Sequence, residues 1–403
     1  MTKVYKQLSE LGNIVTGKTP STANSELWDG DIPFITPTDI KGYDAYYQAS
    51  TERTISDYGA STQKKTILPR NSICVSCIAS IGKMCLTKCT SITNQQINSI
   101  IPNPHNDYRY ILYMLRYNLP YIQLVGGGSG SGTPIISKNK FAKFKFPVET
   151  VLQKQRKIGS ILSAYDSLIE NNTKRIRLLE QMAENLYKEW FVRFRFPGHE
   201  HTEFLDGLPK GWTIKKYSSF VEIMSGGTPN TDNSLYYGGN IPFFTPRDSE
   251  DGVFVYDTLT TITEEGLQHC NSQFYPKDTL IITARGTVGK LNLLAEPMAM
   301  NQSCFALKST ILDAPYYLYY ATNHAVNKLK KMANGGVFDT IIIKTFDHIK
   351  LTMPPIDIIK SYDCKVKTIM ARIQSLQRQS ALLTRQRDLL LPRLMSGKLE
   401  VKA

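Results

Sequence analysis

The sequence contains an internal repeat, and this repeat constrains the fold more than any other feature. Residues 16–39 (TGKTPSTANSELWDGDIPFITPTD) align without a gap with residues 225–248 (SGGTPNTDNSLYYGGNIPFFTPRD), and 13 of the 24 positions are identical. A second block, which includes Gly82-Lys83 and Asn94-Gln95, recurs 207 residues later. The chain therefore consists of two tandem copies of one unit. Two copies are too few for a solenoid, and they predict a pseudo-symmetric protein that binds a target with two halves.

The two copies differ between the repeated blocks. Residues 40–66 and 249–273 share almost no sequence, and residues 103–125 differ from 310–332 in the same way. A shared framework with unrelated inserts is expected if each copy recognises a different target. Neutral drift after a duplication is the alternative explanation.

Composition predicts a cytoplasmic protein with an anionic partner. The first residues lack the apolar core of a signal peptide, and no stretch of eighteen apolar residues could span a bilayer. Seven cysteines without a regular spacing fit reduced thiols. The net charge is +13, of which residues 151–197 supply +4 and residues 358–403 supply +7. Nucleic acid is the commonest partner of such a basic chain.

The pattern along the chain predicts a mixed α/β (α+β) fold in four parts. Residues 1–149 and 198–357 are rich in Gly, Pro and Thr, carry short β-like runs, and are predicted as two globular domains. Residues 150–197 and 358–403 are predicted as long helices. The polar segment 197–211 is interpreted as the linker that opens the second domain.

Both helical parts carry a seam of residues with 4-3 spacing, which predicts an antiparallel coiled coil between them. Asn172 lies on the first seam, where a polar residue sets the register at a cost in stability. The alternative is two separate amphipathic helices, each packed on its own globular domain. Pro392 is predicted to end the second helix. The seam residues are Ile158, Leu162, Ile169, Asn172, Ile176, Leu179 and Leu186 on the first helix, and Ile369, Ile373, Leu376, Leu383 and Leu390 on the second.

Several motifs that could indicate catalysis are rejected. Residues 12–19 (GNIVTGKT) match a phosphate-binding loop, but Pro20 follows directly where a helix should begin, and the second copy does not repeat the motif. Cys74, Cys77, Cys85 and Cys89 have roughly zinc-ligand spacing, yet the second copy lacks cysteines at these positions. No carboxylate pair with a lysine is shared by both copies. The sequence predicts no catalytic residue, no metal site and no cofactor in this chain.

Side chains that could contact DNA recur in both copies. Asn and Gln can bind adenine, and Arg and Lys can bind guanine or phosphate. Arg247 and Arg285 belong to the second copy alone, which suits two different half-sites. The alternative for the matched Asn-Gln pairs is a structural role in satisfying the backbone. The DNA-binding candidates are Lys18, Thr36, Thr38, Lys41, Lys83, Asn94, Gln95 and Gln96 in the first copy, and Thr245, Arg247, Arg285, Lys290, Asn301 and Gln302 in the second.

These features resemble the specificity subunit of type I restriction-modification systems. The resemblance rests on the repeated G-x-TP…IPF-x-TP-x-D block, on LLEQMAENLYKEWFVRFRFPG at 178–198, on LPKGW at 208–212 and on the terminal LLLPRLMSGKLEV. It implies two target-recognition domains that each read one half of a bipartite site in double-stranded DNA. It also implies that the helices form a spacer and dock two methyltransferase subunits, which restriction subunits join.

On this resemblance the chain has no active site of its own, and S-adenosylmethionine, ATP and Mg²⁺ belong to the partner subunits. Two other functions stay open at this point. One is a stand-alone regulator with tandem DNA-binding domains, which would not associate with a methyltransferase. The other is an ATP-binding enzyme built on residues 12–19.

Overall fold

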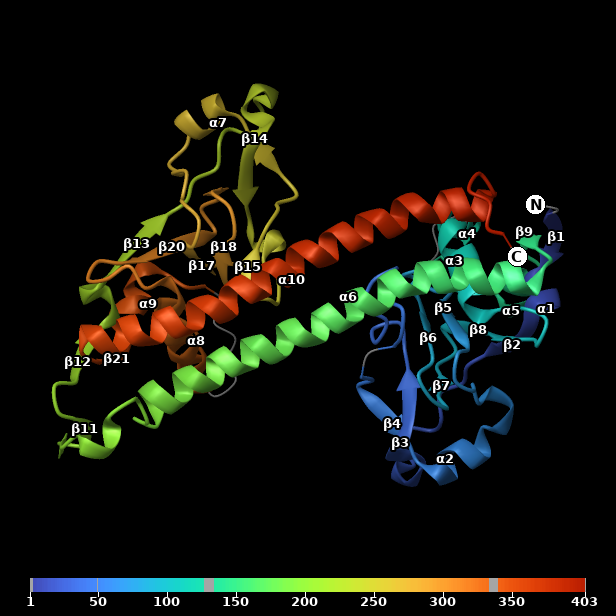
Figure 1. Ribbon diagram of the computed structural model, residues 1–403, viewed down its shortest axis with the longest axis horizontal. Coiled ribbons are helices and arrows are strands. Elements are labelled where there is room, and N and C mark those ends of the chain that lie inside the picture. The colour runs from blue at the N-terminus through green and yellow to red at the C-terminus, as the bar shows by residue number, and fades with distance from the viewer. Residues whose placement is uncertain (1–2, 49, 127–133, 333–339, 403) are drawn as a thin grey trace. The chain divides into compact units, whose positions relative to one another are not determined.

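A computed structural model describes residues 3–48, 50–126, 134–332 and 340–402 (Figure 1). The chain divides into two compact units. The first unit comprises Met1–Thr173 together with Gln379–Ala403, and the second comprises Lys174–Arg378. The two long helices, α6 (Leu152–Tyr187) and α10 (Ile356–Ser396), therefore each contribute one end to each unit.

The first unit contains a mixed globular part. Its strands are β1 (Lys3–Gln7), β2 (Gly12–Thr16), β3 (Trp28–Ile35), β4 (Arg53–Ile55), β5 (Ile73–Ser76), β6 (Met84–Leu86), β7 (Ile92–Thr93), β8 (Ile97–Pro102) and β9 (Lys145–Glu149). Its shorter helices are α1 (Leu8–Leu11), α2 (Asp57–Thr62), α3 (Tyr108–Tyr117), α4 (Leu119–Gly126) and α5 (Lys138–Ala142). The strands form sheets of order β2-β8-β5-β6, β4-β3-β7 and β1-β9.

Strand β5 shows why this sequence forms a buried central strand. Ile73 and Val75 pack in one apolar cluster with Ile111 of α3. Cys74 points to the opposite face and packs in a second cluster with Val15 of β2. Successive side chains of a strand alternate between faces, so an uninterrupted apolar run fits a strand that is covered on both sides.

The second unit repeats this architecture with additions. Its strands are β10 (Phe204–Leu205), β11 (Leu208–Pro209), β12 (Thr213–Lys216), β13 (Val221–Ser225), β14 (Tyr237–Phe244), β15 (Phe254–Val255), β16 (Thr261–Ile262), β17 (Leu280–Thr283), β18 (Leu291–Leu294), β19 (Ala299–Met300), β20 (Cys304–Ser309) and β21 (Lys350–Met353). Its shorter helices are α7 (Glu264–Gln268), α8 (Pro315–Met332) and α9 (Ile343–Asp347). The sheets have the orders β13-β20-β17-β18-β15, β16-β14-β19, β12-β21 and β10-β11.

Apart from the β10–β11 hairpin, the sheets of the two units correspond strand for strand except at one edge. Strand β15 pairs in parallel with β18 in the second unit. Among the described residues of the first unit, the same edge carries an isolated parallel bridge between Tyr47 and Leu86. These edge residues lie in the inserts that the two copies do not share. In each unit the three-stranded sheet and its short helix, α2 or α7, lie at the end remote from the long helices (Figure 1).

Within the first unit, the start of α6 and the end of α10 run antiparallel. Asn172 of α6 donates from Nδ2 to Oε1 of Gln379 (3.0 Å), and Asp166 pairs with Arg387 further along. Ile158 and Leu162 share an apolar cluster with Leu394 and with α3. The helix ends therefore pack on each other and also on the globular part.

The second unit contains the complementary helix ends. The Tyr362 hydroxyl of α10 donates to the Ala183 carbonyl of α6 at 3.1 Å. Both residues belong to the large apolar cluster that also includes Ile373 of α10 and Leu318 of α8. Helix α6 ends in a π-helical turn at Lys188–Val192, which positions Trp190 and Phe191 in the same cluster.

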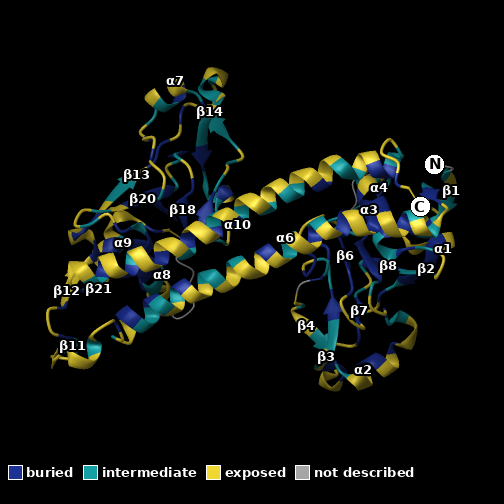
Figure 2. Ribbon diagram, viewed as in Figure 1, coloured by how far each residue is buried: buried dark blue, intermediate teal, exposed yellow. Residues whose placement is uncertain are grey.

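The predicted seam residues are all buried or half-buried. Figure 2 shows buried and intermediate positions between exposed ones along both long helices. The prediction that Pro392 ends the second helix was wrong, because α10 continues to Ser396 with Pro392 inside it. Leu394 and Met395 are almost completely buried in the first unit. Their packing stabilises the last turn despite the hydrogen bond that proline removes. None of the helices among the described residues is long and apolar enough to cross a membrane.

Candidate nucleic-acid interface

Three loops that carry candidate residues meet in the first unit. The loop at Gly17 follows β2 and donates from its backbone N to the Ile97 carbonyl at 3.2 Å. The turn at Asn94 donates from its backbone N to the Ile35 carbonyl of β3 at 3.1 Å. The Thr19 hydroxyl then donates to Oε1 of Gln95 at 2.6 Å. The first loop and the loop after β3 therefore both adjoin the Asn94 turn.

The same three loops meet in the second unit. Gly227 donates from its backbone N to the Met300 carbonyl at 3.1 Å. Asn301 donates from its backbone N to the Phe244 carbonyl at 2.9 Å. The Thr228 hydroxyl donates to Oε1 of Gln302, which repeats the Thr19–Gln95 contact. The repeated sequence blocks therefore build one loop arrangement twice.

The repeated glycines allow these loops to approach closely. A Cβ atom added to Gly17 would lie 2.1 Å from the Thr93 carbonyl oxygen. A Cβ atom added to Gly226 would lie 2.3 Å from the Asn301 carbonyl oxygen. Both neighbours are backbone atoms, so a side chain at either position would displace the loop.

The hydrogen bonds of the matched asparagines support the alternative in which these residues satisfy backbone groups. Oδ1 of Asn94 accepts from the Gln96 backbone N at 3.1 Å. Oδ1 of Asn301 accepts from the Ser303 backbone N at the same distance. These bonds use the amide oxygen that would accept from an adenine amino group. Gln95 and Gln302 are exposed and are held at the surface by the threonine contacts.

A buried aspartate organises the loop after β3 and after β14. Oδ2 of Asp39 accepts from the backbone N (2.8 Å) and the hydroxyl (2.7 Å) of Thr36. Oδ2 of Asp248 accepts from the same two groups of Thr245 at the same distances. Sequence reasoning did not select these aspartates, although both end the repeated TP-x-D motif. The bonds hold the exposed residues between them, Thr38 and Arg247, in equivalent loops.

The remaining cationic candidates occupy different surroundings. Arg285 is exposed, and its loop adjoins Pro246 through a bond from the Thr287 hydroxyl at 3.4 Å. Lys290 is half-buried and pairs with Asp251 at 2.7 Å, so a phosphate would compete with that carboxylate. In the first unit Lys83, the equivalent of Lys290, is half-buried in the turn before β6. The other two cationic candidates of this unit, Lys18 and Lys41, are exposed.

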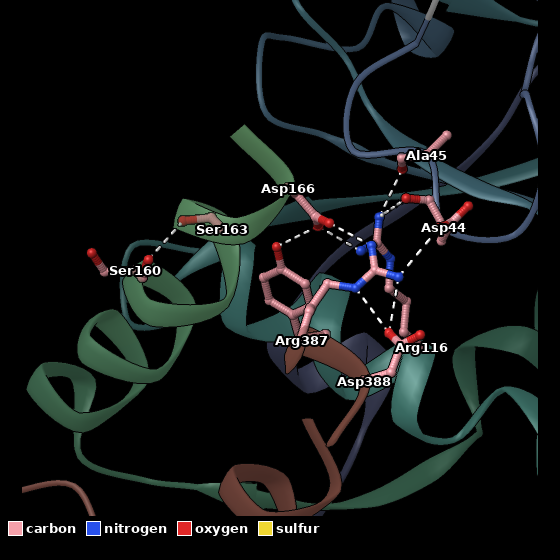
Figure 3. A network of polar contacts seen from close by, with 9 residues as sticks. Asp44, Ala45, Arg116, Ser160, Ser163, Asp166, Arg387 and Asp388 are labelled. Carbon is pink, nitrogen blue, oxygen red and sulfur yellow. Dashed lines mark hydrogen bonds and ion pairs between the residues drawn. The ribbon is translucent and has the colours of Figure 1, made fainter. Parts of the chain in front are cut away.

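A buried ionic network holds the insert of the first unit (Figure 3). Asp166 of α6 accepts from Nη1 of Arg116 (2.7 Å) and from Nη1 of Arg387 (2.5 Å). Arg116 also donates from Nη2 to the carbonyls of Asp44 and Ala45, both at 2.8 Å. Burial lowers the pKa of the Arg387 guanidinium. The nearby carboxylates of Asp166 and Asp388 raise this pKa by more, so the pKa of Arg387 lies above its ordinary value. The network fixes the Asp44 loop to both long helices.

In the second unit a carboxylate on a long helix contacts the insert. Oε1 of Glu180 on α6 accepts from the Val253 backbone N at 3.0 Å. Burial raises the pKa of Glu180, although this hydrogen bond opposes the effect. In the first unit Arg387 of α10 pairs with Asp44 of the insert at 3.2 Å. In both units, therefore, a charged side chain on a long helix contacts the insert, but the sign of the charge differs.

The rejected motifs do not form sites among the described residues. Gly12–Thr16 is strand β2, and the next helical turn begins only at Ser25. Cys74 and Cys85 face each other across β5 and β6, whereas Cys89 is exposed elsewhere. No group of three or more His, Cys, Asp or Glu side chains in the described ranges could hold a metal ion.

Comparisons with known proteins agree with the repeated architecture. The model of the type I restriction modification DNA specificity domain matches residues 2–181 and again residues 209–391. The MjaIX type I restriction enzyme specificity subunit of Methanocaldococcus jannaschii is 27% identical, over 98% of this chain and 93% of its own length. The HindI specificity subunit of Haemophilus influenzae is 22% identical, over 75% of this chain and 78% of its own length.

One solved structure supports the fold. The S subunit of a type I restriction-modification system from M. genitalium has a TM-score of 0.62 at 16% identity, over 98% of this chain and 96% of that one. This likeness confirms the predicted fold class of two tandem mixed α/β domains with long helices.

Proposed function

Because this chain belongs to the type I restriction-modification DNA specificity family, whose members are non-catalytic DNA-recognition subunits, we propose that each unit reads one half of a bipartite site in double-stranded DNA. The observation that carries this proposal is the loop arrangement built twice, around Gln95 and around Gln302. Equivalent loops with different exposed side chains, such as Thr38 and Arg247, suit two half-sites of different sequence.

The long helices form the second part of the proposal. Helix α6 has 36 residues and α10 has 41, and their seam residues are buried or half-buried. Locked seams favour a fixed separation between the half-sites. Several large apolar side chains on the outer faces of these helices are nevertheless exposed, including Leu178 (64%), Met182 (59%) and Leu382 (59%). Such residues suit the docking of two methyltransferase subunits.

The cofactors of the assembled system are assigned to its other subunits. We propose that S-adenosylmethionine is bound by the methyltransferase subunits, and that ATP and Mg²⁺ are used by restriction subunits that join them. The segment 12–19 consists of strand β2 and the loop that follows it, with no helix at its end, which supports this assignment.

The proposal is tested by co-expression with a type I methyltransferase subunit from the same genome. We expect a stable complex that methylates genomic DNA at a motif with two specific halves and an unread spacer. Mapping of methylated bases on plasmid DNA measures this motif directly. A chain that binds DNA but does not purify with the methyltransferase would instead be a stand-alone regulator.

A further inference from the structure

The buried aspartates Asp39 and Asp248 each have a second carboxylate oxygen that contacts the insert. Oδ1 of Asp39 accepts from the backbone N of Glu52 at 2.9 Å. Oδ1 of Asp248 accepts from the backbone N of Leu259 at 2.8 Å. Each aspartate therefore joins the loop after the long strand to the part of the insert that leads into β4 or β16.

These bonds make Glu52 and Leu259 structurally equivalent. They lie 207 residues apart, which is also the offset between Gln95 and Gln302. The inserts that precede them have unrelated sequences and form different edge structures. The common carboxylate bond nevertheless returns both inserts to the same place beside Thr38 and Arg247.

The backbone on either side of these two residues is also held. Arg53 follows Glu52, and its guanidinium carbon lies 3.4 Å from the ring centroid of Trp28. Thr258 precedes Leu259, and its hydroxyl accepts from the Phe243 backbone N at 3.1 Å and donates to the Thr260 carbonyl at 2.7 Å. Each side chain is therefore presented from a fixed backbone position.

Both side chains are exposed, and their chemistry excludes one kind of DNA contact. Leu259 is 83% exposed, and Glu52 is also exposed. Phosphate contacts need hydrogen-bond donors or positive charge, which neither a carboxylate nor an aliphatic side chain supplies. A glutamate can accept a hydrogen bond from the cytosine amino group, and an apolar side chain can contact the thymine methyl group.

We propose that Glu52 and Leu259 are specificity-determining residues that contact base edges in the first and second half-sites, respectively. Glu52 selects a base pair that presents a cytosine amino group, and Leu259 selects one that presents a thymine methyl group. This inference rests on the proposed function, since it assigns the chemistry of two positions within the two DNA-reading surfaces.

The test exchanges the two side chains in the full chain, co-expressed with its methyltransferase subunits. Glu52→Leu and Leu259→Glu are each assayed by mapping methylated bases in a plasmid library with randomised half-sites. We expect each variant to change the preference at one base pair of one half-site, with a loss of discrimination of roughly 5- to 100-fold. The other half-site should stay the same. Glu52→Gln, which retains the shape of the side chain, should relax the cytosine preference without abolishing methylation.

Two variants serve as matched controls. Glu222→Leu and Leu205→Glu make the same changes at exposed positions in β13 and in the β10–β11 hairpin, and they should leave the motif unchanged. An unchanged motif in Glu52→Gln and Leu259→Glu would overturn the proposal, as would a uniform loss of methylation at all sequences in folded protein. If the unmodified complex itself yields no bipartite motif, the proposed function has failed instead.

Discussion

Gly17 and Gly226 lie where two backbone segments approach each other too closely for a side chain. We expect Gly17→Ala to displace the loop that carries Lys18 and Thr19, since its Cβ would meet the Thr93 carbonyl at 2.1 Å. The free energy of unfolding should fall by about 1–3 kcal/mol, as measured by urea denaturation. Reading of the first half-site should weaken, while the second half-site is still read.

Gly252→Ala is the matched control for this substitution. The nearest atom to its added Cβ is Oε1 of Glu180 at 3.4 Å, which is an ordinary contact. This variant should match the unmodified chain in stability and in methylated motif. Equal effects of Gly17→Ala and Gly252→Ala would contradict the close-approach explanation.

Asp166 forms ion pairs with two buried guanidinium groups. Asp166→Ala would leave Arg116 and Arg387 buried without their shared carboxylate. Breaking a buried ion pair by removing one partner costs about 3–5 kcal/mol, and urea denaturation should show a loss of this size. Lys88→Ala removes a partly exposed pair with Glu170 and should change the stability by less than about 1 kcal/mol.

Asp363 should make the stability of the second unit depend on pH. Its Oδ1 accepts from the backbone N atoms of Tyr316 and Tyr317 at the start of α8, both at 3.0 Å. Burial raises the pKa of Asp363 to about 6, despite these hydrogen bonds. In the unfolded chain the pKa of aspartate is about 3.9. Between these values the folded state binds the proton more tightly, so stability falls as pH rises from about 4 to 6.

The size of this effect follows from the pKa difference. About two pH units at about 1.4 kcal/mol per unit set an upper limit near 3 kcal/mol. Asp363→Asn keeps an acceptor for α8 but cannot titrate, so its stability should lack this part of the pH dependence. Urea denaturation of both proteins at pH 4.5 and pH 6.5 measures the difference. Parallel pH profiles for the two proteins would show that Asp363 does not titrate in this range.

At the scale of elements, the two long helices should determine the number of unread base pairs. A heptad inserted after Thr173 in α6 and another after Arg378 in α10 would lie at the boundary between the units and preserve the seam. Each helix would lengthen by about 10 Å. At about 3.4 Å per base pair, the spacer of the methylated motif should grow by about 3 base pairs.

A two-residue insertion at the same places is the control. It would rotate the seam residues of one unit relative to those of the other, and we expect the assembly to be lost. Methylation mapping of the heptad variant gives the spacer length directly. An unchanged spacer would mean that the helices act as a docking surface and not as a ruler.

At the scale of the whole molecule, the two units should read DNA independently. Replacing residues 1–149 with those of a relative should change one half of the methylated motif and leave the other half intact. The replacement must retain an arginine at position 116 and apolar partners for Ile158 and Leu162, because the first unit also contains the helix ends. Motif mapping decides the result, and changes in both halves would contradict independent reading.

The sequence predicted those features that depend on local pattern. The seam residues, from Ile158 to Leu390, were identified from their spacing, since amphipathic periodicity is a property of neighbouring turns. The repeat identified the loops around Gln95 and Gln302. The repeat did not distinguish residues that stabilise the loops from residues that could contact DNA. The turn-forming role of Asn94 and Asn301 is therefore visible only in their hydrogen bonds. The end of α10 was misplaced at Pro392, because the burial of Leu394 and Met395 outweighs the local effect of proline.

A duplicated unit with two long helices can be recognised from the sequence, because repetition and periodicity are local properties of the chain. Which distant residues come into contact depends on the tertiary structure. The pairing of Asp166 with Arg387 spans more than half of the chain. Asp39 accepts from Glu52 and Asp248 from Leu259, and these bonds hold inserts of unrelated sequence. Such contacts depend on how the chain folds back on itself, and no local pattern carries that information.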